Sequence, residues 1–482
     1  MEKSSHSFQR RNQIKKNERH DSFSHEIDSQ VLHPILISGP KIDRYKYSNH
    51  EVLLSCRFVI SGCISYRGSS KAFTLLSEFL HIGSPHYSTI RLWVLRVGYY
   101  ELMKPKEFRS DWVYIIDYTM TIGIEKCLVI LGVPLSNLRE NGFNLSLPCV
   151  NILHLSITKH ANSQVVQNAL SQTSDEAGVP IEIISDYGAD VKKGIDEFCK
   201  KHSQVNFVYD VTHLSGCILK RIVESDNVWV ELSGKIELCK HKTKQSIFSF
   251  LSPPCQRNKS RYLNLEGLIK WARQVKIYEN KGDFSDIENE IRQNGYLVNR
   301  KRYRCPEPEI LEKAVGIFTE KFGWVKQYYA HFEEYDLYMK VINKIKGEIG
   351  IHGLSKHILN KLERLFVEEE LTQKAVSLKD ELMQKIEQYL PKGSKETDTY
   401  LGRSDIIESL FGKYKYYCSE GSMMGLTQSV LIMGAVTSRM DQDTISNAME
   451  FSTLKKIKDW TNINIGETTY AKRKKVMGLI DS

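Results

Sequence analysis

Three acidic residues have neighbours that suit a metal-dependent reaction on phosphate esters. Asp117 and Asp186 each lie within or at the end of an apolar run, and Glu408 lies in a helical pattern far downstream. Carboxylate oxygens are the ligands that Mg²⁺ and Mn²⁺ prefer, because both are hard ions. Two such ions about 3.5–4 Å apart activate an attacking oxygen and stabilise a leaving oxygen during phosphoryl transfer. The residue types therefore predict a site for two Mg²⁺ or Mn²⁺ ions that acts on nucleic acid. Asp117, Asp186 and Glu408 are its expected metal ligands and catalytic residues.

Each aspartate also has an ordinary structural explanation. An unpaired charge inside an apolar strand is costly, and a bound cation would remove that cost at Asp117. A strand-end aspartate can equally cap a loop. Asp186 stands between Ser185 and Gly188, whose residue types favour a turn. The occurrence of both aspartates in one recognisable order of strands favours the metal site.

Asp210 and His213 complicate the set of acids. Asp210 ends another apolar run, at residues 206–210, and His213 follows it three residues later. One interpretation is that they support the metal ligands, with His213 positioning a water or a phosphate. The other is a local hydrogen bond that holds the strand end. The second metal ligand is therefore Asp186 or Asp210, and the order of the strands favours Asp186.

The elements that must position these acids begin near residue 111, where the apolar pattern changes to the period of a strand. Strands are predicted at residues 113–122, 125–133, 150–157, 181–186 and 206–210, with helices at 163–178 and 190–202. The first three strands would form an antiparallel meander, and the later two would join through helical crossovers. This order predicts an α/β fold with a mixed five-stranded sheet, as in a ribonuclease-H-like catalytic core.

The chain before these strands has helical patterns. Residues 51–60, 71–80 and 88–98 have apolar residues on one face, and a Gly-containing turn precedes the last of them. A helix, a turn and a helix with basic and hydroxyl residues are the outline of a helix-turn-helix. Four side chains of the last helix are expected to bind DNA: Ser88, Thr89, Arg91 and Arg96. The same pattern also fits a small bundle whose helices only pack together.

The other segments complete the predicted organisation. Long runs rich in Lys, Glu and Leu after residue 214 predict a mainly α-helical insertion, which basic-aromatic segments interrupt at residues 257–262 and 299–304. The expected division is a disordered basic arm (1–34), a helix-turn-helix domain (35–105), the first part of the core (106–213), the insertion (214–400), and the Glu-bearing helix of the core with a helical C-terminal tail (401–482).

The composition limits the kinds of binding partner and the cellular compartment that we expect for the protein. The 482 residues include 67 Lys and Arg against 58 Asp and Glu, and the net charge of +9 suits a polyanionic partner as well as ordinary solubility. The ten cysteines contain no Cys-x-x-Cys pair, which argues against a zinc knuckle and for reduced thiols. No apolar run reaches the ~18 residues of a membrane helix, and the first residues lack the apolar region of a secretory signal. A cytoplasmic, nucleoid-associated protein without a membrane partner is expected.

Residues 114–117 and 404–415 together resemble the DDE transposases of bacterial insertion sequences, which belong to the ribonuclease-H-like integrase superfamily. The resemblance extends over roughly residues 45–420. In that family the first Asp lies on the first strand, the second just past the fourth strand, and the Glu on a late helix. Asp117, Asp186 and Glu408 match these positions, so the resemblance implies that they form the catalytic triad.

A subset of this family carries the pattern Tyr-x2-Arg-x3-Glu-x6-Lys around the glutamate. Tyr400-x2-Arg403 and Glu408-x6-Lys415 fit, but four residues rather than three separate Arg403 from Glu408. The resemblance places Arg403 and Lys415 beside the metal ligands or the phosphate next to the scissile bond.

Some members of the family have an insertion whose Trp stabilises flipped or hairpin DNA, and Trp271 and Trp324 are the candidates here. Lys270 and Arg273 flank Trp271, which suits stacking on a base. A buried core position is the alternative for either Trp.

The resemblance implies a DNA transposase with a two-step reaction. Water attacks a phosphodiester at the transposon end and frees a 3′-hydroxyl, which then attacks target DNA. Both steps are in-line displacements that one two-metal site can serve. The implied partners are double-stranded DNA and further copies of the chain in a synaptic complex. Three alternatives stay open: a ribonuclease-H-like nuclease without strand transfer, a non-catalytic DNA-binding protein derived from a transposase, and a helical structural protein with chance acids.

Overall fold

The computed structural model describes residues 45–255, 261–298, 301–418 and 425–480. The basic arm expected at residues 1–34 lies outside the described residues. The chain divides into two compact units. The smaller unit combines residues up to 104 with 416–419 and 427–467, and the larger unit contains 105–415, 420–426 and 468–482.

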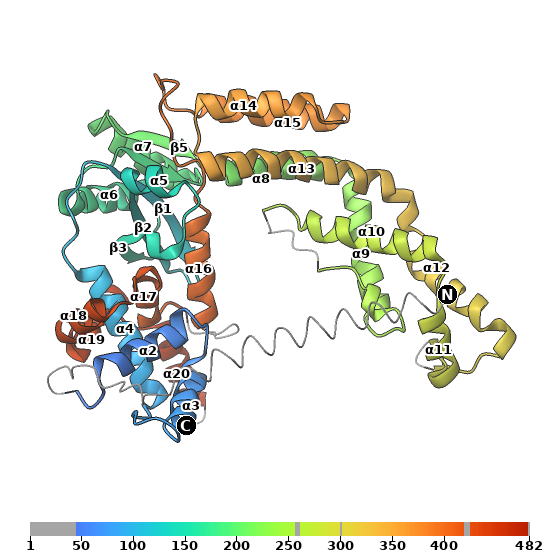
Figure 1. The fold of residues 1–482 in the computed structure, drawn as a ribbon, viewed down its shortest axis with the longest axis horizontal. Coiled ribbons are helices and arrows are strands. Elements are labelled where there is room, and N and C mark those ends of the chain that lie inside the picture. Colours follow the sequence, from blue (N-terminus) through green and yellow to red (C-terminus); the bar gives the residue numbers. More distant parts are fainter. Residues whose placement is uncertain (1–44, 256–260, 299–300, 419–424, 481–482) are drawn as a thin grey trace, which may run out of the picture. The chain divides into compact units, whose positions relative to one another are not determined.

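A five-stranded sheet forms the core of the larger unit (Figure 1). Its strands are β1 (Trp112–Met120), β2 (Lys126–Pro134), β3 (Asn151–Thr158), β4 (Glu182–Ser185) and β5 (Asn206–Tyr209). The order across the sheet is β3-β2-β1-β4-β5. The first three strands pair antiparallel, and β4 and β5 run parallel to β1. The predicted mixed five-stranded sheet is confirmed, and its order is consistent with a ribonuclease-H-like core.

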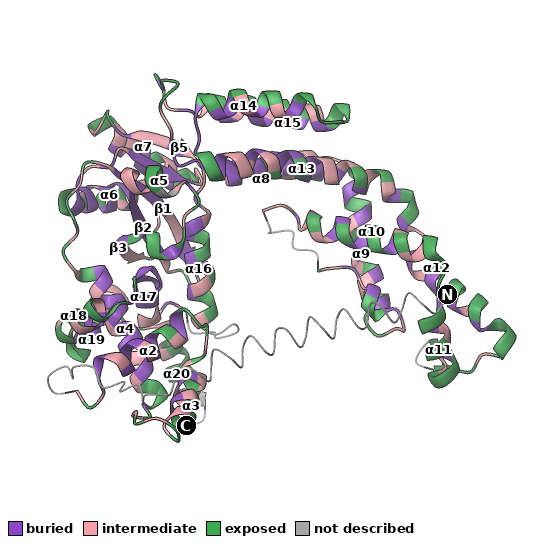
Figure 2. Cartoon of the chain, viewed as in Figure 1, coloured by how far each residue is buried: buried purple, intermediate pink, exposed green. Residues whose placement is uncertain are grey.

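The apolar sequence of β1 explains its place at the centre of the sheet. The four residues before Asp117 are fully buried, and Figure 2 shows β1 and β2 buried along most of their length. Side chains alternate between the two faces of a strand. On one face Tyr114 and Ile116 belong to the hydrophobic core formed with helices α6 (Ser163–Ala177) and α7 (Ala189–Lys201). Asp117 therefore projects from the other face of β1.

The segment between β5 and residue 400 is mainly helical, as expected of the insertion. Its elements are α8 (Val211–Glu224), α9 (Asn227–Thr243), α10 (Leu265–Lys281), α11 (Ser285–Asn294), β6 (Tyr296–Val298), β7 (Lys301–Tyr303), α12 (Ile310–Phe322), α13 (Tyr329–His352), α14 (Lys356–Val367) and α15 (Gln373–Gln388). The long helix α13 contacts α8, α10, α14 and α15 (Figure 1). At the end of the insertion, the backbones of Leu354 and Tyr400 pair with each other. The larger unit also contains the C-terminal helix α20 (Thr469–Ile480).

Helix α4 (Tyr87–Met103) is the centre of the smaller unit. It packs against five further helices: α2 (Asn49–Ile60), α3 (Tyr66–Leu76), α17 (Ile432–Thr437), α18 (Gln442–Phe451) and α19 (Leu454–Asn464). The grouping differs from the expected division, because helices near the C-terminus complete the bundle begun by residues 49–103. Among the described helices of both units, none combines the length and the apolarity that crossing a membrane requires.

Two glycines allow the backbones of α4 and α17 to touch. A Cβ atom on Gly98 would collide with the carbonyl oxygen of Leu431, and a Cβ atom on Gly434 would collide with the carbonyl oxygen of Gly98. Backbone atoms cannot rotate away as a side chain can, so neither position accepts even a methyl group without a shift of the helices.

We expect Gly98→Ala to lower the free energy of unfolding of the smaller unit by about 1–3 kcal/mol, because overpacking forces the backbone to move. Urea denaturation of the full chain, followed by circular dichroism, measures the change. Gly347→Ala is the control, since nothing lies within 4 Å of its Cβ position. It should leave stability unchanged or raise it by up to ~1 kcal/mol, as alanine favours a helix interior. Equal stability of the two variants would contradict the close approach of the helices.

His154 on β3 predicts a dependence of stability on pH. Burial lowers the pKa of its ring from 6.5 to about 4, and its buried Nε2 has no hydrogen-bond partner among the residues that the structure describes. Between these two values the unfolded chain binds the proton more readily than the folded one. The free energy of unfolding should therefore fall as the pH is lowered from about 6.5 towards 4, by at most ~1.4 kcal/mol for each pH unit.

We expect His154→Gln to reduce this slope between pH 6.5 and pH 5, measured by urea denaturation at several pH values. His160→Gln serves as the control because His160 is exposed. A wild-type slope that survives unchanged in His154→Gln would show that another group is responsible.

Candidate active site

The register of the sheet brings Asp117 and Asp186 to one edge. The last paired residues of the parallel strands β1 and β4 are Ile115 and Ile184. Each aspartate lies two residues beyond that pair, so both stand at the same end of neighbouring strands, whose backbones are about 4.8 Å apart. Both side chains are half-buried. These two aspartates and Glu408 are referred to below as the acid site.

A tight turn after β4 holds Asp186. The backbone N–H of Gly188 donates to Oδ1 of Asp186 at 3.0 Å. Tyr187 between them has a φ of 58°, a left-handed conformation that is uncommon for a bulky residue. Its ring stacks on Tyr209 of β5 with the centroids 4.1 Å apart, which stabilises that conformation. Unusual backbone of this kind clusters at functional sites.

A short return segment, residues 401–404, places the third acid. The N–H of Leu401 donates to the buried carboxylate of Glu182 on β4 at 2.9 Å, and the carbonyl of Gly402 accepts from the N–H of Val211 at 3.0 Å. Helix α16 (Asp405–Tyr417) begins directly after this segment. It therefore starts beside the ends of β4 and β5, and Glu408 lies in its first turn.

The second anchor of the return segment is a buried carboxylate. Ser404 donates its hydroxyl hydrogen to Oδ2 of Asp210 at 2.5 Å, and the N–H of Thr212 donates to Oδ1 at 2.7 Å. Asp210 is completely buried and is the N-cap of α8. Both of its oxygens are thus engaged in holding the end of β5 and the start of α16. This role leaves Asp186 as the acid that the register places beside Asp117.

Electrostatic interactions connect Asp117 with the other two acids. The pKa of Asp117 is raised to about 8. Burial is the largest cause of this rise, and the negative charges of Asp186 and Glu408 contribute to it. The N–H of Tyr118, which donates to Oδ1 at 2.6 Å, acts in the opposite direction. Neighbouring carboxylates oppose one another's ionisation, and a cation among them reverses the effect. This edge of the sheet is therefore a place where a cation would be stabilised.

Arg261 also reaches the acid site, a position that its sequence pattern did not predict. It precedes α10 in the insertion, and its guanidinium forms an ion pair with the Glu408 carboxylate. A second nitrogen lies 3.9 Å from the carboxylate of Asp405. Burial raises the pKa of Glu408, whereas the Arg261 charge lowers it. The basic-aromatic segment at 257–262 was the sequence feature that could have indicated a role for Arg261. The sequence did not show its contact with Glu408, because the two residues are 147 positions apart.

The donor atoms of the acid site suit Mg²⁺ or Mn²⁺, because they are all carboxylate oxygens. The Asp117 carboxyl, whose charge is disfavoured by burial and by its acidic neighbours, would gain from such an ion. Within the described ranges, however, no three His, Cys, Asp or Glu side chains are close enough together to hold one. The carboxylate of Glu408 is instead paired with Arg261.

The remaining residues expected near the acids have distinct positions. His213 is half-buried with its ring 6.0 Å from that of Tyr209, and burial lowers its pKa. No hydrogen bond in the described part of the chain joins it to Asp210. Arg403 donates to the carboxylate of Asp405 at 2.7 Å and to the carbonyl of Lys346 at 3.2 Å, so it stabilises the start of α16.

Lys415 lies on α16 seven residues after Glu408 and is exposed. Seven residues are about two turns of an α-helix, so both side chains lie on the same side of α16. A phosphate bound at the acid site would therefore have a lysine further along the same helix face.

The expected DNA-binding side chains of α4 differ in exposure. Ser88 is exposed, whereas Thr89, Arg91 and Arg96 are half-buried. The guanidinium of Arg96 packs over the ring of Tyr45 with 5.3 Å to the centroid, which directs it to the protein. The prediction that Arg96 faces a DNA groove is therefore not supported, because α4 is enclosed by other helices of the bundle.

The guanidinium of Arg91 lies beside the side chain of Gln428. With the amide oriented so that its oxygen faces Arg91, both terminal guanidinium nitrogens lie 3.1 Å from that oxygen. Arg91 thus has a partner within the smaller unit.

Trp271 is a core residue and is not placed to stack on a base. It is 6% exposed, and its Nε1 donates to the carbonyl of Leu251 at 2.9 Å. Its ring lies 6.2 Å from that of Trp324 and 6.4 Å from that of Phe332. The prediction of a DNA-stacking Trp271 is corrected accordingly: the flanking cations are exposed because the helix is amphipathic, while the ring faces inward.

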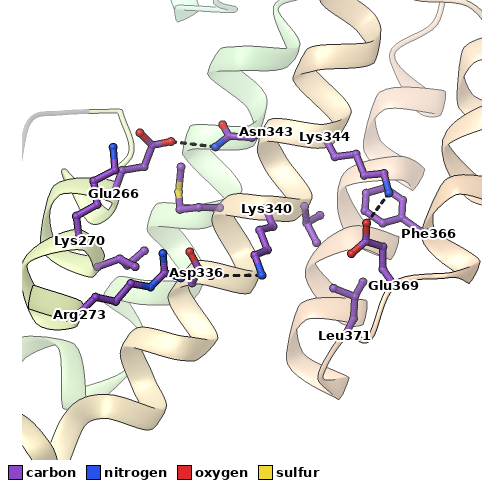
Figure 3. Close-up of a pocket in the computed structure, with 13 residues that line it drawn as sticks. Glu266, Lys270, Arg273, Asp336, Lys340, Asn343, Lys344, Phe366, Glu369 and Leu371 are labelled. Atoms are coloured by element: carbon purple, nitrogen blue, oxygen red, sulfur yellow. Dashed lines mark hydrogen bonds and ion pairs between the residues drawn. The ribbon is translucent and has the colours of Figure 1, made fainter. Parts of the chain in front are cut away.

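A cavity of about 580 Å³ lies within the insertion, lined by residues of α10, α13 and α14 (Figure 3). Asp336 pairs with both Arg273 and Lys340, and Lys344 pairs with Glu369 at 2.7 Å. These charges largely offset one another. None of the three acids lines this cavity, so its size does not make it the site of the chemistry.

We expect Ser404→Ala to lower the free energy of unfolding of the larger unit by about 1–3 kcal/mol, because it leaves an oxygen of the buried Asp210 without its donor. Urea denaturation measures the effect. Ser409→Ala, an exposed position on the same helix, should change stability by less than ~0.5 kcal/mol. The anchoring role of Ser404 is wrong if the two substitutions have the same small effect.

No protein-family model matches the chain, and no curated protein matches it in sequence. One solved structure with a similar arrangement is the Drosophila P element transposase strand transfer complex. It is 11% identical, with a TM-score of 0.33, and the alignment covers 92% of this chain and all of that chain. At this identity and TM-score, the likeness does not establish a shared function.

Proposed function

We propose that this protein is a DNA transposase of the DDE type, which cuts transposon ends and joins the freed 3′-hydroxyl to target DNA. The observation that carries the proposal is the position of Asp117 and Asp186 at the same end of the parallel strands β1 and β4 of a mixed five-stranded sheet, with Glu408 on the helix that begins beside the end of β5. Two strand-end aspartates and a glutamate on a late helix are the arrangement that the resemblance to DDE transposases implies.

In this proposal the residues of the acid site hold two Mg²⁺ or Mn²⁺ ions. When bound, the ions would activate the attacking oxygen and stabilise the leaving oxygen of each in-line displacement. Asp117 and Asp186 are supplied by rigid strands, and Glu408 by a helix that is tied to the sheet through Glu182 and Asp210. This rigidity keeps the two aspartates in place for both reaction steps.

The proposed substrate is double-stranded DNA, which the protein would meet in the cytoplasm at the nucleoid. Lys415, on the same helix face as Glu408, would contact a phosphate beside the scissile bond. Cleavage and joining of two transposon ends would take place in a synaptic complex that contains more than one copy of the chain.

We expect Asp117→Asn, Asp186→Asn and Glu408→Gln each to weaken Mn²⁺ binding by at least ~10-fold in calorimetric titrations of the full chain, because each removes one charged ligand. Asp190→Asn is the matched control: it removes an exposed carboxylate four residues after Asp186. It should change the affinity less than 2-fold, roughly the error of such a comparison. If the three variants bind Mn²⁺ as the wild type does, the acids do not form a metal site.

Activity on DNA separates the transposase from its alternatives. Nicking of supercoiled plasmid with Mn²⁺ tests cleavage, and incubation with pre-cut ends of the DNA that flanks the coding sequence tests joining. Nicking and joining that are both lost in Asp117→Asn support a transposase. Nicking without joining indicates a nuclease, and DNA binding without either reaction indicates a non-catalytic DNA-binding protein.

A further inference from the structure

We propose that Arg261 is a catalytic arginine that the helical insertion supplies to the acid site, and that it exchanges the carboxylate of Glu408 for the scissile phosphate of DNA. The inference rests on the proposed function and names a further residue for that reaction. It derives from the ion pair between Arg261 and Glu408 and from the way in which the fold seats the arginine.

Arg261 is held against the core by its neighbours. The hydroxyl of Tyr262 donates to the carbonyl of Thr212 in the first turn of α8 at 2.9 Å. Lys346 of α13 lies over the ring of Tyr262, 4.7 Å from its centroid. Two helices of the insertion thus hold the side chain of Tyr262, the residue next to Arg261.

A glycine provides the space for the arginine side chain. A Cβ atom on Gly216 of α8 would collide with Cγ of Arg261. The absence of a side chain at this position lets the Arg261 stem cross α8 and reach α16. The Arg261 side chain is 21% exposed, so the guanidinium is partly desolvated. Such a contact is stronger than one between two fully exposed groups.

The charge of Arg261 acts on several acids around the site. Besides its contacts with Glu408 and Asp405, it partly opposes the rise that burial causes in the pKa of Asp117 and of Asp210. The neighbouring Arg403 is instead engaged by Asp405 and by a carbonyl of α13. Arg261 is therefore the cation directed at the glutamate that is expected to bind a metal ion.

Guanidinium chemistry explains the exchange. A guanidinium binds carboxylate and phosphate oxygens with the same planar set of donors. Metal ligation by Glu408 requires that this carboxylate leave Arg261, and a scissile phosphodiester at the same place presents equivalent anionic oxygens. Arg261 would then stabilise the negative charge that builds up on the phosphate during each displacement.

We expect Arg261→Ala to have opposite effects on metal binding and on catalysis. Its Mn²⁺ affinity, measured by calorimetry of the full chain without DNA, should rise by about 3-fold, because a competing positive charge is removed from Glu408. Plasmid nicking at saturating Mn²⁺ should fall by at least ~100-fold, as expected for loss of a group that stabilises transition-state charge. Arg261→Lys should bind Mn²⁺ like the wild type and nick at an intermediate rate, because it keeps the charge but loses the planar donors.

Two further variants separate this role from simple anchoring of the insertion. Arg273→Ala removes another arginine of the insertion, one that pairs with Asp336, and should change neither Mn²⁺ affinity nor nicking. In the Glu408→Gln background, Arg261→Ala should no longer raise the Mn²⁺ affinity, since the interaction it relieves is already absent. An Arg261→Ala protein with wild-type Mn²⁺ affinity, or with weaker Mn²⁺ binding and a lowered melting temperature, would overturn the inference.

The dependence of Mn²⁺ binding on Glu408 separates an error about Arg261 from an error about the metal site. If the wild type binds Mn²⁺ in a Glu408-dependent way but Arg261→Ala has none of the predicted effects, only the role of Arg261 is wrong. If Mn²⁺ binding by the wild type does not depend on Glu408, the metal site and the role of Arg261 are both overturned.

Discussion

The acid site depends on a buried set of hydrogen bonds that ties residues 401–404 to the sheet. Leu401 is held by the carboxylate of Glu182 across 219 residues of sequence, and Ser404 is held by Asp210 across 194. Closing a loop of this length has an entropic cost that grows only slowly with its length. Two buried carboxylates would be strongly destabilised without their donors, so breaking these contacts is expensive. The fold thereby keeps Glu408 near the strand-end aspartates although a long insertion separates them.

The same constraint shapes the insertion. It leaves the core at α8, directly after β5, and returns at residue 400, where Tyr400 pairs with Leu354. The N–H of Val211 at its start donates to the carbonyl of Gly402 just past its end, so the two ends of the insertion lie side by side. Helices can be added to an insertion whose two ends lie together without disturbing the core. A residue near those ends, such as Arg261, can reach the acid site. The insertion thus contributes a cation to a site whose own residues are mostly acidic.

The site combines features that oppose one another. Burial and the charges of Asp186 and Glu408 raise the pKa of Asp117, and the turn after Asp186 contains a left-handed Tyr187. The surrounding structure offsets both: the Arg261 charge acts against the repulsion, and the stack on Tyr209 stabilises the turn. Neighbouring acids and a left-handed turn would each be unfavourable in isolation. They are retained here because the packing around them stabilises the conformation.

The sequence alone determined those features that depend on near neighbours. The pattern of apolar residues predicted the five strands, with the first three as an antiparallel meander, and the positions of Asp117 and Asp186 at strand ends followed from it. The helical period likewise placed Glu408 on a helix. Long-range contacts decided the rest: Asp210, which caps α8 through Thr212, also holds Ser404, Trp271 is buried against other helices, and Arg261 pairs with Glu408. A periodic pattern indicates which side of a helix or strand is apolar, but not which distant element covers that side. Only the tertiary structure therefore revealed these roles.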